Sequence, residues 1–133
     1  MAVERIEKDG RSISTVIRGH YDRDGVRFFS EPEGSLQLGL HIRKGGEEVK
    51  PHYHRPFTSV EGLRPEEFFY VVYGRVQVDL YDEGKLLRTI VLGPGDCVLL
   101  SDGGHGVKFL EDTKMIEIKQ GPYRGADEEK EFL

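Results

Sequence analysis

Short apolar runs closed by glycine-containing turns place the tightest limit on what this chain can fold into. Many of its 17 glycines stand in small clusters between these runs. Within the runs apolar and polar residues alternate, as in β-strands, whose successive side chains point to opposite faces. The sequence shows no convincing helical period. The pattern predicts an all-β fold of about ten short strands, arranged as an antiparallel sandwich or barrel.

Two segments show the pattern most clearly. Residues 36–43 alternate strictly, which predicts a half-buried strand. One face of this strand would hold Leu36, Leu38, Leu40 and Ile42, and the other Gln37, Gly39, His41 and Arg43. Residues 67–73 are rich in aromatic and β-branched side chains, which predicts a buried strand. The expected strands are residues 12–18, 26–30, 36–43, 48–54, 67–73, 75–81, 85–92, 96–101, 105–110 and 113–120.

Composition narrows the class of protein. A length of 133 residues, 37% of them hydrophobic and 32% charged, fits one globular domain spanning residues 1–133. The net charge is −5 and no basic stripe is present, so we expect no nucleic-acid partner. No apolar run approaches the roughly 20 residues of a membrane helix, so we expect no membrane partner either.

The N-terminus and the one cysteine favour a cytoplasmic protein. Residues 1–8 lack the apolar core of a secretion signal. Cys97 has no second cysteine with which to form an internal disulfide, which agrees with a reducing compartment. Because Cys97 stands in an apolar run, we expect a small core residue rather than a nucleophile.

Three histidines and one glutamate suggest a metal site. His52 and His54 are two apart in an expected strand, so both imidazoles point to the same side. Glu67 begins the next apolar run, and His105 stands at the start of a later strand. Three imidazoles and a carboxylate suit one divalent transition metal ion, such as zinc, iron, manganese, nickel or copper. Each residue also has a simpler interpretation: exposed edge-strand histidines, a charged strand start, and a histidine that only follows a turn.

With these residues placed, the chain resembles the cupin superfamily. The first cupin motif is Gly, five residues, His-x-His, three or four residues, Glu, six residues, Gly. It is matched here by Gly46, His52, His54, Glu67 and Gly74. Glu67, not Glu66, has the six-residue spacing to Gly74 and therefore takes the ligand role. The gap from His54 to Glu67 is longer than in the motif, which suggests an insertion in the loop 55–66 at the barrel mouth.

The second cupin motif is matched less closely. Gly95 begins it and Gly103 is retained, but Ser101 replaces the motif proline. His105 arrives one residue early, and Phe109 replaces the motif asparagine. The resemblance covers roughly residues 36–120, flanked by an N-terminal arm and an acidic C-terminal tail.

The resemblance implies a fold, a metal and a range of functions. The fold would be a double-stranded β-helix, or jelly-roll barrel, of the RmlC-like cupin type, in which the three histidines and Glu67 bind the ion. The function would be that of a metalloenzyme, isomerase-, epimerase- or dioxygenase-like, acting on a small polar substrate such as a sugar or keto acid. The alternatives are a non-catalytic, metal-stabilised module that binds or senses a small molecule, and a barrel that has lost its metal. Cupins frequently pair through an edge strand, so we expect a homodimer.

The sequence leaves two interpretations open for each of four further residues, Glu117, Lys119, His20 and His41. Glu117 and Lys119 share a strand face, and they either line the pocket and hold an anionic substrate or form a solvated face. His20 and His41 lack partners at ligand spacing, so we expect surface histidines or histidines satisfied inside the protein. Tyr70 lies opposite Glu67 in strand phase, and we expect it outside the metal cavity.

Overall fold

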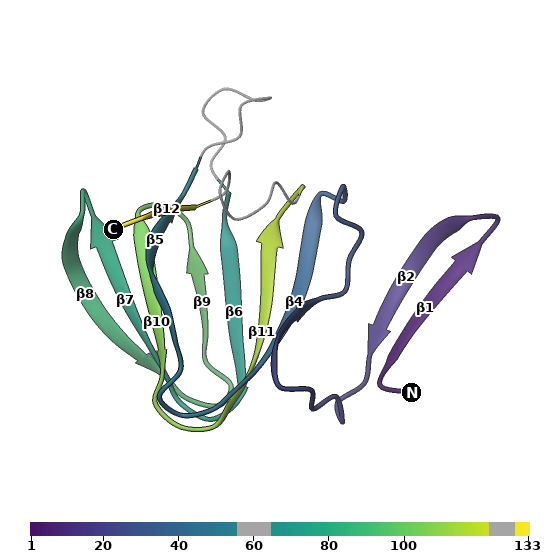
Figure 1. Cartoon of the computed structure of the whole chain (residues 1–133), viewed down its shortest axis with the longest axis horizontal. Coiled ribbons are helices and arrows are strands. Elements are labelled where there is room, and N and C mark those ends of the chain that lie inside the picture. The colour runs from purple at the N-terminus through teal and green to yellow at the C-terminus, as the bar shows by residue number, and fades with distance from the viewer. Residues whose placement is uncertain (56–64, 123–129) are drawn as a thin grey trace.

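The computed structural model describes residues 1–55, 65–122 and 130–133, and all regular structure in these ranges is β (Figure 1). The strands are β1 (Val3–Lys8), β2 (Arg11–Ile17), β3 (Gly25–Phe28), β4 (Leu36–Arg43), β5 (Glu48–His54), β6 (Glu67–Tyr73), β7 (Val76–Asp82), β8 (Lys85–Leu92), β9 (Cys97–Leu100), β10 (Gly104–Phe109), β11 (Thr113–Gln120) and β12 (Lys130–Phe132). Among the described residues no helix is long and apolar enough to span a membrane.

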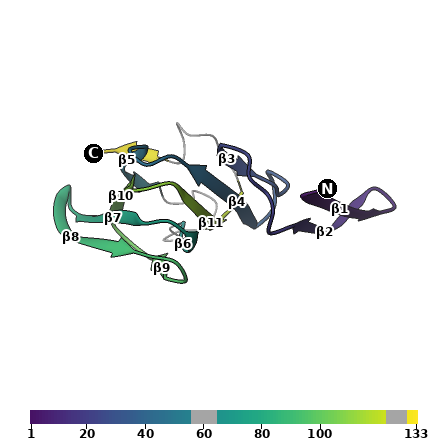
Figure 2. The ribbon, with the colours of Figure 1, turned by 90° about the horizontal axis from the view of Figure 1, so that it is seen from below.

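Two five-stranded antiparallel sheets face each other. One has the strand order β12-β5-β10-β7-β8 and the other β3-β4-β11-β6-β9. Apart from β7-β8 and β3-β4, neighbours in each sheet are not consecutive in the chain, as the crossing connections in Figures 1 and 2 show. This is the jelly-roll arrangement, and it confirms the expected fold class.

The strand pattern of the sequence is largely confirmed. The expected strands 36–43, 48–54, 67–73, 85–92 and 113–120 have the same bounds in the structure. One strand, β12, was not expected: it lies in the acidic tail and pairs with β5. The N-terminal arm contains β1, which pairs with β2.

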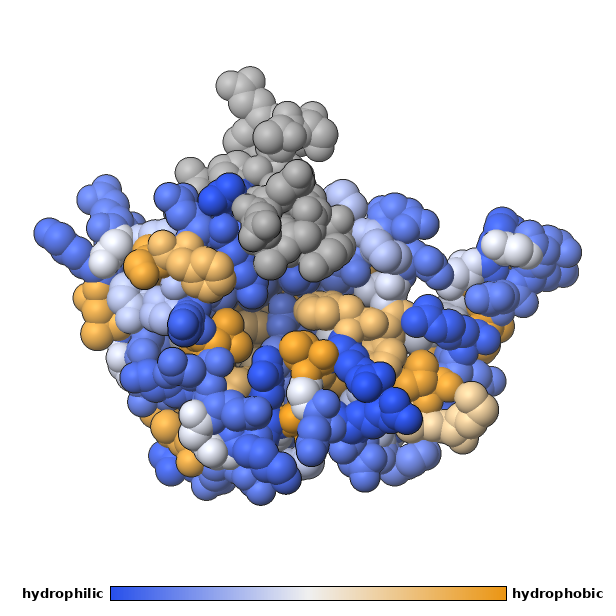
Figure 3. All heavy atoms as spheres, in the orientation of Figure 1, coloured by the Kyte–Doolittle hydropathy of each residue, from blue (hydrophilic) through white to orange (hydrophobic). Residues whose placement is uncertain are grey.

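The hairpin formed by β1 and β2 projects from the body of the protein (Figures 1 and 2). Within the described chain its strands pair only with each other. Its base contacts the body through Ala2, Val3 and Ile17. In Figure 3 the projecting part is mostly hydrophilic, so little of it is buried.

The main core lies between the two sheets and reaches the histidines, since the Phe69 ring is 6.1 Å from that of His105. Its buried side chains are Phe69, Val71, Val76, Val78, Leu92, Leu100, Val107, Phe109 and Met115. The motif glycine at the turn before β7 is required for this packing. Gly74 has a φ of 93°, and a Cβ there would overlap Thr113 and the backbone of Asp112.

Strand β4 is oriented with its polar face inward, which reverses the usual arrangement. Its inward residues line the barrel interior, and both Gln37 and His41 are buried. Its aliphatic face points outward, where Leu40 and Ile42 pack in a second core under Tyr21 and Phe29. The N-terminal segment therefore covers an outer apolar face and leaves a polar barrel interior.

One expectation from the sequence, that Cys97 is a small core residue, is wrong. The apolar run around it predicts a core residue, but Cys97 is exposed. It stands in β9, the edge strand of its sheet, where alternate side chains face outward and no further strand of the described chain covers them.

Candidate metal centre

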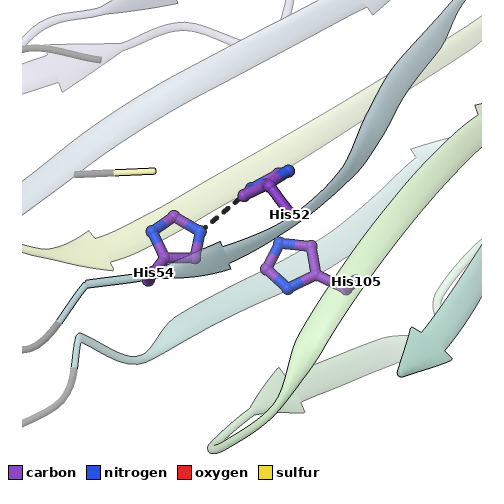
Figure 4. Close-up of side chains that lie close together, drawn as sticks. All are labelled: His52, His54 and His105. Atoms are coloured by element: carbon purple, nitrogen blue, oxygen red, sulfur yellow. Dashed lines mark hydrogen bonds between the residues drawn. The ribbon is translucent and has the colours of Figure 1, made fainter. Parts of the chain in front are cut away.

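Strands β5 and β10 place the three histidines together. His52 and His54 project from the same side of β5 (Figure 4). In the pairing of β5 with β10, His105 is the residue directly opposite His52. The ring centroids of His52 lie 4.9 Å from His54 and 4.6 Å from His105. The three rings face one another, with their nearest ligand atoms all within 4.8 Å.

Glu67 joins this cluster from the opposite sheet. Its Oε1 lies 2.9 Å from Nε2 of His54, and its Oε2 lies 3.2 Å from Nε2 of His105. The four side chains are at most 8% exposed. The neighbouring Glu66 is exposed, as the motif spacing predicts. The structure thus brings together all four residues chosen from the sequence.

The hydrogen bonding of His52 sets its tautomer. Its Nδ1 lies 2.7 Å from the carbonyl oxygen of Lys50, which can only accept. Nδ1 therefore carries the hydrogen, and in the neutral ring the lone pair is on Nε2. That atom faces Nε2 of His54 at 3.2 Å. A backbone carbonyl that orients the ring in this way is the usual support of a metal-ligating histidine.

Burial and hydrogen bonding hold the cluster in a state suited to ligation. Burial, and to a lesser extent the nearby His105, lowers the pKa of His52 from 6.5 to about 3, although the hydrogen bond to the Lys50 carbonyl opposes the shift. Burial alone would raise the pKa of Glu67, but hydrogen bonds from His105 and His54 hold it well below its ordinary value. A neutral imidazole and an ionised carboxylate are the forms that bind metal ions.

The residues present fit a divalent transition metal ion. Three imidazoles and one carboxylate are borderline donors for zinc, iron or manganese, and they converge from two sheets in a buried position. Only the convergence is a property of the structure, and ligation by these four residues stays a prediction.

Two cavities reach the cluster. A cavity of about 90 Å³ lies between the sheets, and His52, Glu67 and His105 are among the residues that line it. A smaller cavity of about 20 Å³ touches the other side of His54 and Glu67, next to Ser101 and Asp102. The expected role of the loop 55–66 in shaping access falls mostly on residues 56–64, which lie outside the described residues.

Sequence reasoning missed the part played by His41. We expected His41 to be either a surface histidine or a histidine satisfied inside the protein. It is the second, because His41 is 4% exposed and its Nε2 lies 2.6 Å from Oε1 of Glu117. Both residues line the larger cavity. The available clue was the alternation of residues 36–43, which places His41 and Arg43 on one face. His20, by contrast, is exposed, and Tyr70 lies outside the cavity as expected.

No protein-family model matches the chain. The polyketide synthase CurC of Streptomyces cyaneus is 44% identical over 52 residues, which make up 39% of this chain and 29% of that protein. The matched segment thus spans less than a third of this curated relative.

Solved structures share the fold. A cupin superfamily protein from Desulfitobacterium hafniense is 15% identical, with 78% of this chain and 83% of that chain covered and a TM-score of 0.57. KdgF from Halomonas sp. is 26% identical, with 74% and 78% covered and a TM-score of 0.53. A mutant of the oxalate decarboxylase OxdC of Bacillus subtilis is 19% identical, with 84% and 28% covered and a TM-score of 0.62.

Fold and side-chain cluster together define a jelly-roll barrel with a candidate metal centre in its interior. The chain has the fold of the cupin superfamily, as its first motif indicated.

Proposed function

We propose that the protein is a metal-dependent cupin enzyme that acts on a small polar molecule such as a sugar or a keto acid. One observation carries the proposal: His52, His54, His105 and Glu67 converge in a buried position beside a cavity of about 90 Å³. Three imidazoles and one carboxylate that converge on a common point are a donor set that suits a divalent transition metal ion.

The bound ion, the side chains around it and the surrounding strands would each have a different task. A bound divalent ion would act as a Lewis acid on an oxygen of the substrate. The Lys50 carbonyl fixes the ring of His52, and Glu67 supplies negative charge that balances a cation in the buried site. The strands around the cavity exclude bulk water, which strengthens every electrostatic contact inside it.

Two of the similar structures support this class of function. Oxalate decarboxylase from Bacillus subtilis has Mn(II) centres. Its name describes a reaction on a small dicarboxylate, and KdgF from Halomonas sp. is a second similar cupin. These likenesses support a metal and a small substrate for this chain, and leave the reaction type to experiment.

Metal content is the direct test. Protein purified without a histidine tag should hold close to one equivalent of a transition metal by elemental analysis. His52→Ala and His54→Ala should fall below a tenth of an equivalent, whereas His20→Ala, which changes an exposed histidine, should keep the full content. A metal content near zero in the unmodified protein, after growth in metal-supplemented medium, would overturn the proposal.

A non-catalytic binding or sensing module is the alternative within the same fold. It predicts bound metal and a ligand-dependent rise in melting temperature, but no product by mass spectrometry. Turnover that disappears in His52→Ala and persists in His20→Ala would decide for the enzyme.

We also propose that two copies of the chain form a dimer through the outer face of the β3-β4-β11-β6-β9 sheet. Ile118, Phe68 and Leu99 form a row across β11, β6 and β9. They border a groove of about 380 Å³, and Leu99 is 59% exposed. A second copy is the proposed occupant, because a two-fold axis would pack this apolar row against the same row of the partner.

Two leucines of similar exposure separate this dimer from a general loss of solubility. The unmodified chain should elute with twice its 15.1-kDa mass in light scattering, and Leu99→Glu should elute as a monomer. Leu87→Glu, on the exposed strand β8, should remain dimeric. A monomeric unmodified chain at the highest attainable concentration would exclude the interface.

A further inference from the structure

The wall of the larger cavity formed by β4 and β11 carries charged side chains that the metal centre does not use. Glu117 and Lys119 project inward from β11, and His41 and Arg43 from the adjacent β4. Glu117 and Lys119 are each 7% exposed. Charged groups are rarely buried to this extent without a specific role, so this wall requires its own explanation.

Charge makes the cavity attractive to anions. Three cationic side chains line it, Arg43, Lys119 and Lys130, against the two carboxylates of Glu67 and Glu117. A bound divalent ion would add further positive charge. The chain as a whole has a net charge of −5, so the positive balance is local to the cavity. Local positive charge in a cavity of low dielectric concentrates anionic ligands.

Lys119 is held close to the metal-ligand cluster. In the pairing of β11 with β6 it is directly opposite Glu67, so both side chains start from the same face of the sheet. Its ammonium group lies 4.6 Å from the centre of the Phe28 ring. Phe28 fits there because Gly39 has no side chain, and a Cβ on Gly39 would lie 2.7 Å from that ring. Lys119 is therefore oriented, not mobile in solvent.

The hydrogen bonding of His41 orients Glu117. Nε of Arg43 donates to Nδ1 of His41 over 3.2 Å, and arginine has no acceptor. Nδ1 is therefore unprotonated, and the hydrogen of the neutral ring is on Nε2, from which it is donated to Oε1 of Glu117. A carboxylate accepts several hydrogen bonds, so Glu117 keeps capacity for a donor from a ligand.

We propose that this wall is the anchoring site for a small hydroxy or keto carboxylate. Lys119 pairs with the carboxylate of the ligand, and Glu117, oriented by His41, accepts a hydrogen bond from the hydroxyl of a hydroxy acid. The inference rests on the proposed function in that the same ligand extends toward the metal centre. A cavity of about 90 Å³ has room for several water molecules or an acid of about two to four carbon atoms.

Binding of three small compounds tests the proposal. Calorimetric titration of the metal-loaded protein should show lactate and pyruvate binding at least tenfold more tightly than neutral lactamide. Lys119→Met should weaken the binding of both acids at least tenfold and leave the metal content unchanged. Lys85→Met, which removes an exposed lysine of β8, should leave both affinities unchanged.

A second variant tests the role of Glu117. Glu117→Gln keeps an oxygen that accepts from His41 and removes the charge. The substitution should weaken the binding of lactate severalfold more than the binding of pyruvate, because only lactate has a hydroxyl hydrogen to donate. Equal affinities of lactamide and lactate, or a loss of affinity in Lys119→Met no greater than in Lys85→Met, would overturn the inference.

The same samples separate this inference from the metal proposal. Full metal content without preferential binding of the acids refutes the anchoring site alone. If the unmodified protein takes up no metal but still binds the acids in a way that depends on Lys119, the metal proposal fails and the anchoring site stands. Melting curves of each variant, within a few degrees of the unmodified protein, show that the fold is intact.

Discussion

His52 and His105 are directly opposite each other in the pairing of β5 with β10, with ring centroids 4.6 Å apart. This register brings residues 53 positions apart in the sequence into one cluster. Glu67 from the other sheet closes the cluster through His54 and His105. The site is thus built from both sheets, and its geometry depends on the closure of the barrel.

Glu67 and Glu66 form a matched pair for testing the carboxylate ligand. Glu67→Gln should weaken metal binding about 10–100-fold, because the site loses a charged oxygen donor that contacts two of the histidines. Glu66→Gln changes an exposed side chain and should leave the affinity unchanged. Competition with a chromophoric chelator measures both values, and equal affinities in the two variants would remove Glu67 from the ligand set.

Metal binding should stabilise the fold. At a free metal concentration of 100 times the dissociation constant, the folded state gains about 3 kcal/mol. For a chain of 133 residues this raises the melting temperature by about 10 °C. Calorimetry of the metal-free and metal-loaded protein measures the rise. His52→Ala should show almost none of it, and the same rise in that variant would place the bound metal elsewhere.

The metal-free protein should lose stability as the pH falls. Folding lowers the pKa of His52 from 6.5 to about 3, so between these values the unfolded chain binds a proton that the folded chain does not. This contribution is complete above pH 6.5 and is lost toward pH 3, by up to about 1.4 kcal/mol per pH unit. Glu67, whose pKa is also lowered on folding, acts in the same direction below pH 4.5.

Urea unfolding at pH 7.5, 6.5 and 5.5 measures this dependence. His52→Gln should flatten the decline relative to the unmodified protein, whereas His20→Gln should retain it, because His20 is exposed. A free energy of unfolding that rises on acidification over this range would contradict the assignment of His52 as a buried neutral ring.

The parts of the structure that follow from local pattern could be predicted. Alternation, β-branched and aromatic composition and glycine turns together predicted the bounds of the five strands shared with the structure, and motif spacing selected Glu67 over Glu66. The motif glycines Gly46, Gly74, Gly95 and Gly103 all have positive φ values, which explains why the turns require glycine.

The parts that depend on long-range packing could not be predicted. Alternation divides β4 into two faces but does not say which one points into the barrel. That choice depends on Tyr21 and Phe29, which cover Leu40 and Ile42 from outside. His41 therefore became an interior residue, and its partner Glu117 is 76 positions away in the sequence. Cys97 is exposed, and not buried as expected, for a similar reason. The edge position of β9 is a property of the whole sheet.

Substitutions of Phe109 and Leu87 compare the cost in stability at a core position with that at a surface position. Phe109 is 1% exposed in the main core, beneath the Arg43 guanidinium at 5.4 Å from the ring centroid. Phe109→Ala removes a buried ring and should lower the free energy of unfolding by about 3–5 kcal/mol. Leu87 on β8 is 72% exposed, and Leu87→Ala should change it by no more than about 0.5 kcal/mol. Urea unfolding measures both values, and a cost below 1 kcal/mol for Phe109→Ala would show that the barrel interior is not close-packed around β10.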